Sequence, residues 1–273
     1  MINRGDYMEK KRADILLFER GLVESREKAK RVIMEGAVFI EDRKIDKPGE
    51  KVSIDSPINI RKNPITYVSR GGLKLEKAID VFNIELNDKT AMDIGASTGG
   101  FTDCMLKNGA KKVYAIDVGY GQLDWELRND PRVVVKERTN IRYVTEEDID
   151  EIMDFISIDV SFISLRLVLP IAKKFLSEMG HIVALIKPQF EAGKTKVGKK
   201  GLVRNKGTHY EVIKTITEFC KTIELNIIGI DFSPITGITG NIEFLAYIAL
   251  GNGNRSVDDC RIIQVIDKAH SSL

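Results

Sequence analysis

Four charged side chains interrupt or border apolar stretches of this 273-residue sequence: those of Lys74, Asp159, Lys187 and Glu243. Glu243 stands inside the run NIEFLAYIAL and Lys187 ends another apolar run, so both lose water unless they find partners. Two amines and two carboxylates can pair with one another, and many such clusters are purely structural ion networks. The same cluster can also perform acid–base chemistry, because a lysine gives up its proton more easily when it is desolvated or lies beside a second cation.

A glycine-rich stretch offers a second kind of site. It reads TAMDIGASTGGF over residues 90–101, where a strand pattern ends in Asp93 and a helical pattern begins at Phe101. Glycines let backbone N–H groups approach a ligand closely, and a helix N-terminus adds donors and partial positive charge. The spacing matches neither the dinucleotide fingerprint nor the P-loop, and it includes no lysine for phosphates. It therefore favours a ligand without phosphates, S-adenosylmethionine, over an ordinary strand–helix turn.

Asp117 strengthens this interpretation because it ends the next apolar strand pattern. An acid at that position can accept hydrogen bonds from ribose hydroxyls. The residues expected to bind the cofactor are Asp93, Gly95, Ala96, Ser97, Thr98, Gly99, Gly100, Phe101 and Asp117.

With such a cofactor, the charged cluster would serve the transfer of a methyl group to a ribose 2′-hydroxyl. Lys187 is the candidate base, provided that desolvation or the second lysine favours its neutral amine. Asp159 would steady that lysine and the positive end of the cofactor, while Lys74 and Glu243 would orient the target ribose. This chemistry needs no metal and no covalent intermediate.

Apolar strand patterns alternate with helical patterns after residue 69. Seven strands are expected: two that end in Asp93 and Asp117, then 133–135, 155–158, 182–186, 227–231 and 242–249. Near-continuous apolar strands predict an α/β fold with a doubly wound, mostly parallel sheet, and the short link between the last two strands predicts an antiparallel edge. Ligands of such sheets lie at the carboxyl ends of the strands, where four candidate residues are expected: Gly95, Asp117, Asp159 and Lys187.

A smaller unit precedes this sheet. Two short helical patterns and two short strand patterns predict a small α+β domain over residues 1–60, with a frayed start. Residues 61–68 are expected to link it to a second domain over 69–273. The small domain is basic, although the whole chain has a formal net charge of only +2. Its candidate RNA phosphate contacts are Arg12, Arg20, Arg26, Lys28, Lys30, Arg31, Lys44 and Lys47, and interleaved glutamates leave a merely solvated surface as the alternative.

Residues 187–206 form a second cationic stretch, with glycines at 193, 198 and 201. We expect a flexible loop that orders over RNA, and a solvated loop is the alternative. Its candidate RNA contacts are Lys196, Lys199 and Lys200. Trp125 and Phe190 are expected to pack in the core. The alternatives are a place beside adenine for Trp125 and stacking on a flipped base for Phe190.

Composition excludes several classes of protein. The three cysteines are widely separated, which suggests neither a disulfide framework nor a zinc site, and the three histidines lack ligand spacing. No apolar stretch reaches the roughly 18 residues of a membrane span, and no signal peptide is evident. These features predict a cytoplasmic chain without a metal or a membrane span, and they leave its oligomeric state open.

Similarity to the S4 RNA-binding domain is carried by RADILLFERGLVESREKAKRVIMEGAVFIEDRKIDKPGEKV. Nearly the whole chain resembles the TlyA family through this stretch and VSRGGLKL, DIGASTGGFTD, AIDVGYGQL, LRNDPRVVVKERTN, DVSFISL, ALIKPQFE and GNIEF. That family joins an S4 domain to a Rossmann-like methyltransferase domain of the FtsJ type. The resemblance implies S-adenosylmethionine-dependent 2′-O-methylation of cytidine in 16S or 23S ribosomal RNA, or both, with ribosomal RNA or ribosomal subunits as partners. It also implies a catalytic tetrad at Lys74, Asp159, Lys187 and Glu243.

Two other functions remain open. A non-catalytic RNA-binding or ribosome-assembly factor could keep the methyltransferase fold, although charged residues at all four tetrad positions argue against it. A small-molecule methyltransferase would leave the basic N-terminal module without a task. Members of the family have also been called haemolysins, but no stretch here is long and apolar enough to cross a bilayer, so any lytic role would be indirect.

Overall fold

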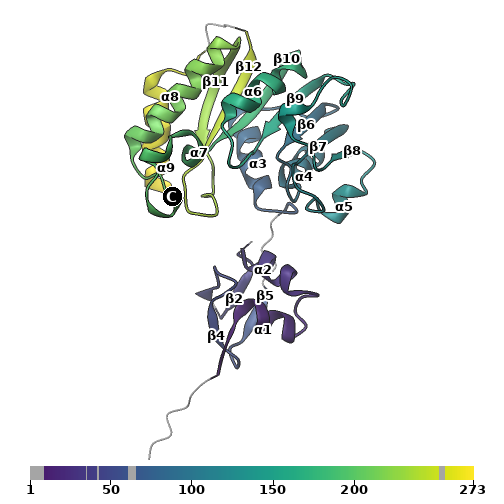
Figure 1. Cartoon of the computed structure of the whole chain (residues 1–273), viewed down its shortest axis with the longest axis vertical. Helices are drawn as coiled ribbons and strands as arrows, with labels where there is room; N and C mark the ends of the chain where they lie inside the picture. The colour runs from purple at the N-terminus through teal and green to yellow at the C-terminus, as the bar shows by residue number, and fades with distance from the viewer. Residues whose placement is uncertain (1–8, 35, 42, 61–65, 252–255) are drawn as a thin grey trace, which may run out of the picture. The chain divides into compact units, whose positions relative to one another are not determined.

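The structure is a computed structural model that describes residues 9–34, 36–41, 43–60, 66–251 and 256–273. Two compact units divide the chain, Met1–Thr66 and Tyr67–Leu273 (Figure 1). Most of the expected frayed start and residues 61–65 of the expected linker lie outside the described residues. Tyr67 and Val68, which the sequence analysis assigns to the linker, belong to the second unit.

The first unit is a small α+β domain. Its elements are β1 (Lys10–Arg12), α1 (Ala13–Glu19), α2 (Arg26–Met34), β2 (Val38–Ile40), β3 (Arg43–Lys44), β4 (Lys51–Ser53) and β5 (Ile58–Ile60). β1 pairs with β4, and β2 lies between β3 and β5, all antiparallel. Ser25 caps α2, because its Oγ accepts a 3.1 Å hydrogen bond from the Lys28 amide. Leu17 and Ile33 bring the two helices into one fully buried core.

Only two of these five strands, β2 and β4, correspond to the two strand patterns predicted from the sequence. All five have only two or three residues, so none shows more than about one strand period. Regular structure begins at Lys10.

The second unit is a seven-stranded sheet covered by helices. Its strands are β6 (Thr90–Ile94), β7 (Lys112–Ile116), β8 (Val133–Lys136), β9 (Met153–Ile158), β10 (Leu176–Ile186), β11 (Leu225–Phe232) and β12 (Phe244–Leu250). Its α-helices are α3 (Gly71–Phe82), α4 (Gly100–Lys107), α5 (Trp125–Arg128), α6 (Leu165–Lys174), α7 (Pro188–Glu191), α8 (Lys206–Thr222) and α9 (Asp259–Ser272). Its 3₁₀ turns are η1 (Ile141–Tyr143), η2 (Lys194–Lys196) and η3 (Lys199–Gly201).

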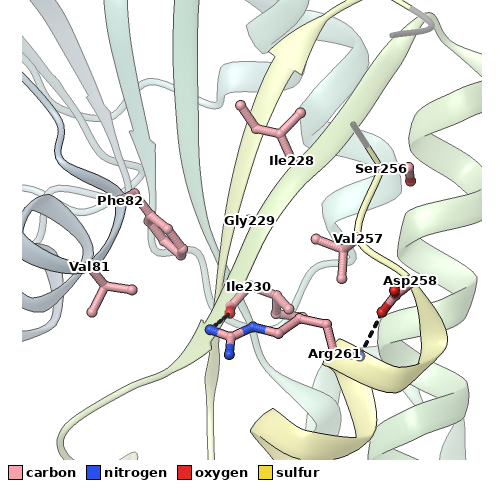
Figure 2. A pocket seen from close by; sticks show the side chains of 9 residues that line it. All are labelled: Val81, Phe82, Ile228, Gly229, Ile230, Ser256, Val257, Asp258 and Arg261. Carbon is pink, nitrogen blue, oxygen red and sulfur yellow. Dashed lines mark hydrogen bonds between the residues drawn. The ribbon is translucent and has the colours of Figure 1, made fainter. Parts of the chain in front are cut away.

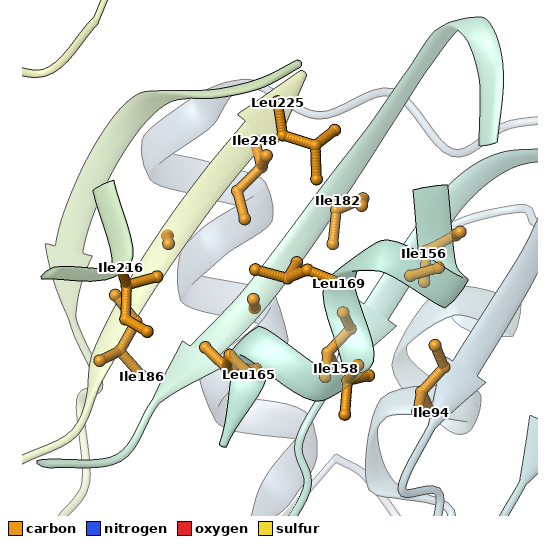
Figure 3. Packing of buried hydrophobic residues seen from close by; sticks show 14 of the residues in the cluster. Ile94, Ile156, Ile158, Leu165, Leu169, Ile182, Ile186, Ile216, Leu225 and Ile248 are labelled. Atoms are coloured by element: carbon orange, nitrogen blue, oxygen red, sulfur yellow. The ribbon is translucent and has the colours of Figure 1, made fainter. Parts of the chain in front are cut away.

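The strand order confirms the predicted fold class. It is β11-β12-β10-β9-β6-β7-β8, with β10 to β8 parallel and β12 antiparallel to both of its neighbours. On one face, α6, α8 and α9 share a continuous buried core with the strands. Figure 3 shows part of it, with Leu169 of α6 and Ile216 of α8 packed on the strands. Ile158 of β9 and Leu169 are among its fully buried side chains. The polar residues Asp117, Asp159 and Lys187 lie just beyond the ends of β7, β9 and β10.

Several boundaries differ from expectation by one or two residues, and two boundaries and one placement need comment. β10 starts six residues before Ile182, with an irregular register along the way. β12 starts at Phe244 rather than Ile242, so Glu243 lies just before the strand. Trp125, expected in the core, is 75% exposed, because α5 has only four residues and presents Leu127 to the interior instead.

Candidate active site

Lys74, Asp159, Lys187 and Glu243 meet at one edge of the large sheet. Asp159 directly follows β9 and Lys187 directly follows β10, and these strands are parallel neighbours. Glu243 directly precedes β12, and because β12 runs antiparallel to β10, its start lies at the same edge. Lys74 reaches this edge from the first turn of α3.

A chain of ion pairs joins the four side chains. Lys74 Nζ lies 2.8 Å from Glu243 Oε2 and 3.3 Å from Asp159 Oδ2. Lys187 Nζ lies 2.5 Å from Asp159 Oδ1 and 3.1 Å from Ser161 Oγ. Asp159 therefore bridges two lysines, and Lys74 bridges two carboxylates.

Three of these groups are almost completely removed from water: Lys74, Lys187 and Glu243 are 9%, 8% and 3% exposed. The Asp159 side chain is 18% exposed. Burial opposes ionisation of Asp159, but the ammonium groups of Lys74 and Lys187 outweigh it and hold the pKa of this carboxyl below its usual range. Burial likewise disfavours the charged form of Lys74, but Asp159 and Glu243 raise its pKa above the ordinary value. Lys74 is therefore a cation and Asp159 an anion throughout the neutral range.

Two glycines allow the backbone to pack against the tetrad. A Cβ on Gly95 would lie 2.6 Å from the carbonyl oxygen of Asp159, and Gly95 has a left-handed φ of +90°. A Cβ on Gly237 would lie 2.5 Å from Glu243 Oε1. A side chain at Gly95 would push on the backbone of Asp159, so glycine is required there, whereas a side chain at Gly237 would displace the end of the Glu243 side chain.

The loop after β6 and the end of β7 form a hydrogen-bonded unit beside the tetrad. Asp117 Oδ2 accepts a 2.8 Å hydrogen bond from the Ser97 amide, and its Oδ1 accepts one of 2.7 Å from the Gly119 amide. A carboxylate has about four acceptor positions, so Asp117 keeps capacity for further donors. Among the predicted cofactor residues of this loop, Ser97 is exposed, and Gly95 and Thr98 are half-buried. The others are buried: Ala96, Gly99, Gly100 and Phe101.

Asp93 is a correction to the predicted set of ligand-contacting residues. Its carboxylate is fully buried, accepting hydrogen bonds from Thr102 Oγ1 at 2.7 Å and Ser157 Oγ at 3.1 Å. Burial raises the pKa of Asp93 to about 7, even though both hydroxyls favour its anion. The side chain thus fastens α4 and β9 behind the glycine loop instead of facing a ligand.

Phe162 is a candidate site residue that sequence reasoning missed. It is 91% exposed, and its φ of +64° is rare for a bulky residue. Its ring centroid lies 5.0 Å from that of Phe190, which in turn lies 5.9 Å from Lys187 Nζ. A cavity of about 330 Å³ adjoins Phe190. No periodicity signals a left-handed aromatic, and the stretch DVSFISL was informative only through resemblance.

The candidate RNA cations of the first unit differ in how they are engaged. Arg20 donates to the carbonyl oxygens of Ser56, at 2.8 Å, and Ile54, so its guanidinium braces the domain. Arg12 and Arg26 both pair with Asp14, at 2.9 and 3.5 Å.

Other cations of this unit are held less firmly. Lys30 pairs with Glu27, and Lys44 with Asp46. Two further candidates, Lys28 and Lys47, are exposed, and the side chain of Arg31 lies outside the description.

The cationic stretch 187–206 is built from short helical turns rather than an irregular loop. Lys196 pairs with Glu211 of α8, whereas Lys199 and Lys200 are exposed on η3. Asn241 fastens this stretch, because its side chain accepts from the Val203 amide and donates to the Gly201 carbonyl, each at 2.8 Å.

A second cavity, of about 350 Å³, lies at the opposite end of α3 from Lys74 (Figure 2). Arg261 at its rim donates to the Ile230 carbonyl at 3.3 Å, and Asp258 caps α9 through the Arg261 amide at 2.7 Å. Both charged groups are thus engaged by the protein itself, and the cavity gives no sign of a ligand.

The sheet, the glycine loop and the tetrad define a methyltransferase of the FtsJ-like type, preceded by an S4 domain. Those two families match residues 67–250 and 11–58 of the chain. The chain belongs to the TlyA family, as its similarity to several members over most of its length demonstrates.

Proteins of several bacteria are similar to this chain over most of its length. "Putative rRNA methyltransferase YqxC" of Bacillus subtilis is 52% identical, over 97% of this chain and 96% of that protein. "16S/23S rRNA (cytidine-2'-O)-methyltransferase TlyA" of Mycobacterium tuberculosis is 41% identical, over 87% of this chain and 89% of that protein. A solved structure described as "Putative hemolysin from Streptococcus thermophilus" is 47% identical, covers 97% of both chains and superposes with a TM-score of 0.78.

None of the helices in the described part of the chain combines the length and the apolar character needed to cross a membrane. The same part of the chain has no group of three or more His, Cys, Asp or Glu side chains placed to hold a metal ion.

Proposed function

We propose that this chain transfers a methyl group from S-adenosylmethionine to the ribose 2′-hydroxyl of a cytidine in 16S or 23S ribosomal RNA, or in both. The observation that carries the proposal is the buried network of Lys74, Asp159, Lys187 and Glu243 beside the glycine loop. The name of the Mycobacterium tuberculosis relative supports the choice of cytidine and of ribosomal RNA. Ribosomes are cytoplasmic, so we propose that compartment as well.

The residues beside the tetrad fit the proposed cofactor. Asp117 has acceptor capacity left after binding the Ser97 and Gly119 amides, which suits the two hydroxyls of a ribose. Gly95 and Gly99 have left-handed φ values, of +90° and +95°, which let the loop turn tightly at the end of β6 and which residues with side chains rarely adopt. Bound S-adenosylmethionine supplies an electrophilic methyl group on a sulfonium.

Lys187 is the better candidate for the base. Lys74 faces two carboxylates, and its raised pKa keeps it protonated and suited to orienting an oxygen. Lys187 faces one carboxylate, which it shares with Lys74, and one hydroxyl, that of Ser161. Its ammonium therefore has fewer carboxylate partners than that of Lys74. As the general base, Lys187 would take the proton of the 2′-hydroxyl.

The remaining surfaces suit an RNA substrate. The exposed Phe162 ring, supported by Phe190, can stack on a base that has left its helix. Lys199 and Lys200 flank the same edge and can contact phosphates, as can Lys28 and Lys47 in the S4 unit.

The test is transfer of labelled methyl from S-adenosylmethionine to purified 30S and 50S subunits. We expect transfer to at least one subunit, and a fall of about a hundredfold or more for Lys187→Ala, the lower range for loss of a general base. Lys221→Ala, which changes an exposed lysine of α8, is the matched control and should keep full activity. Binding of cofactor and RNA without any transfer would instead support a non-catalytic assembly factor, and transfer to small molecules alone would exclude the ribosomal role.

A further inference from the structure

Glu191, the last residue of α7, joins two segments that follow neighbouring strands. Its Oε2 accepts a 2.6 Å hydrogen bond from Ser164 Oγ, and its Oε1 accepts one of 2.7 Å from the Leu165 amide. Ser164 ends the loop that Asp159 begins, and Glu191 ends the helical turn that follows Lys187.

The two segments are therefore joined at both ends. At one end, Lys187 and Asp159 form their 2.5 Å ion pair, and at the other end Glu191 accepts a hydrogen bond from Ser164. The Phe162–Phe190 ring contact crosses between the two segments.

Helix capping alone does not explain Glu191. Ser164 already caps α6, because its Oγ accepts from the Arg166 amide at 3.2 Å. Glu191 comes from a different element, and binding the Ser164 hydroxyl and the Leu165 amide together fixes α7 relative to α6. What it adds is a fixed distance between the loop of Asp159 and the turn of Lys187.

We infer that Glu191 is a positioning residue for the methyl transfer, a role that rests on the proposed function. It lies away from the reacting atoms and acts through two segments at once: it keeps Lys187 aligned with Asp159, and it keeps Phe162 in its left-handed conformation over Phe190. Misplacement of a reacting group by about 1 Å can cost about a hundredfold in rate, so the loss of this contact should appear in kcat.

Two substitutions separate geometry from charge. In Glu191→Gln, the amide oxygen can accept from the Leu165 amide, and the amide nitrogen can donate to Ser164 Oγ in place of the Arg166 Nε donor that lies 3.3 Å from that oxygen, so both contacts can survive. In Glu191→Ala, both are lost. We expect kcat to fall about tenfold or more for the Ala variant and about threefold or less for the Gln variant. KM for S-adenosylmethionine should stay unchanged in both, because the Ser97–Asp117 contacts are separate.

Several outcomes would overturn the inference. One is an unchanged kcat in the Ala variant, and another is an equal defect in both variants. A third is a parallel loss of kcat, cofactor affinity and melting temperature in Glu191→Ala, which would indicate general damage to the fold. Glu218→Ala, which changes an exposed glutamate of α8, is the matched control.

A second readout does not depend on activity. Amine-reactive labelling followed by peptide mass spectrometry measures the reactivity of Lys187 against that of Lys74 in the same molecule. Release of Lys187 from Asp159 should at least double this ratio in Glu191→Ala and leave it unchanged in Glu191→Gln. An unchanged ratio in the Ala variant would refute the alignment role. Absence of methyl transfer by the wild type would refute the proposed function while leaving this measurement valid.

Discussion

Lys74 and Glu243 lie 169 residues apart in the sequence, and Lys74 Nζ donates a 2.8 Å hydrogen bond to Glu243 Oε2 in the interior. Lys74 belongs to the helix that precedes the sheet, and Glu243 to the segment that enters its last strand. Since each is less than a tenth exposed, neither charge has water as an alternative partner. The contact therefore joins the beginning and the end of the second unit at its proposed reaction centre.

Breaking this pair on one side should destabilise the second unit. Glu243→Leu leaves Lys74 with Asp159 alone, and we expect a loss of about 3 kcal/mol in the free energy of unfolding. The double variant Lys74→Met with Glu243→Leu should recover most of that loss, because no buried charge is left without its partner. Urea unfolding measures the stability of the single variants Glu243→Leu and Lys74→Met and of the double variant. A double variant less stable than either single variant would contradict this account. All three variants should be inactive.

Gly95→Ala should damage both the glycine loop and the tetrad. The added methyl group would meet the Asp159 carbonyl oxygen at 2.6 Å, and the residue must also keep φ at +90°. Gly251→Ala is the matched control, since Gly251 has φ of +93° with open space around it. Both should lose about 1 kcal/mol from backbone strain, while Gly95→Ala alone should lose more and should also weaken S-adenosylmethionine binding. Equal melting temperatures and cofactor affinities for the two variants would refute the contact.

Asp93 should make stability depend on pH. Its native pKa of about 7 lies above the ordinary value of 3.8, so between those values the folded state holds a proton that the unfolded state has lost. The contribution of Asp93 to stability therefore falls as pH rises from about 4 to about 7. Asp93→Asn lacks this titration and should gain about 2 kcal/mol relative to wild type between pH 5 and pH 8.

Chemical unfolding at the two pH values tests the titration of Asp93. Asp80→Asn, which changes an exposed carboxyl on α3, is the control and should show no such gain. A pH dependence for Asp93→Asn that parallels the wild type would show that Asp93 is ionised in the folded state.

Lys199 and Lys200 should contribute to the salt dependence of RNA binding. Each phosphate contact that is lost lowers the slope of log affinity against log salt by about 0.7 to 0.9, so Lys199→Gln with Lys200→Gln should lower it by about 1.5. Lys196→Gln should have a smaller effect, because that lysine already pairs with Glu211. Binding measured across a salt series tests this, with Lys221→Gln as control. An unchanged slope would mean that the stretch is only a solvated surface.

Sequence reasoning succeeded where local pattern carries the information. The apolar runs that end at Asp159 and Lys187 are strands β9 and β10, and the rule that ligands lie at carboxyl ends brought both residues to one edge before any contact was known. The hairpin of β11 and β12 was likewise readable from its short glycine-containing link.

Sequence reasoning failed where the burial or the hydrogen bonding of a side chain depends on its neighbours in the folded chain. Asp93 carries the same residue type and strand-end position as Asp117, yet one is buried under Thr102 and Ser157 while the other bonds the exposed Ser97. Arg20 looks like a free surface cation in the sequence, but in the structure its guanidinium donates to the carbonyl oxygens of Ser56 and Ile54.

By itself, then, the sequence determined the succession of elements, the class of sheet and the edge at which its polar residues gather, because hydrophobic period and turn residues act over a few positions. Only the tertiary structure decided which charges meet. Placing β12 between β10 and β11 sets Glu243 against Lys74, and the packing of α7 on α6 sets Glu191 against Ser164. Such partners lie tens to hundreds of residues apart, so their contact depends on strand order and helix packing rather than on any local pattern.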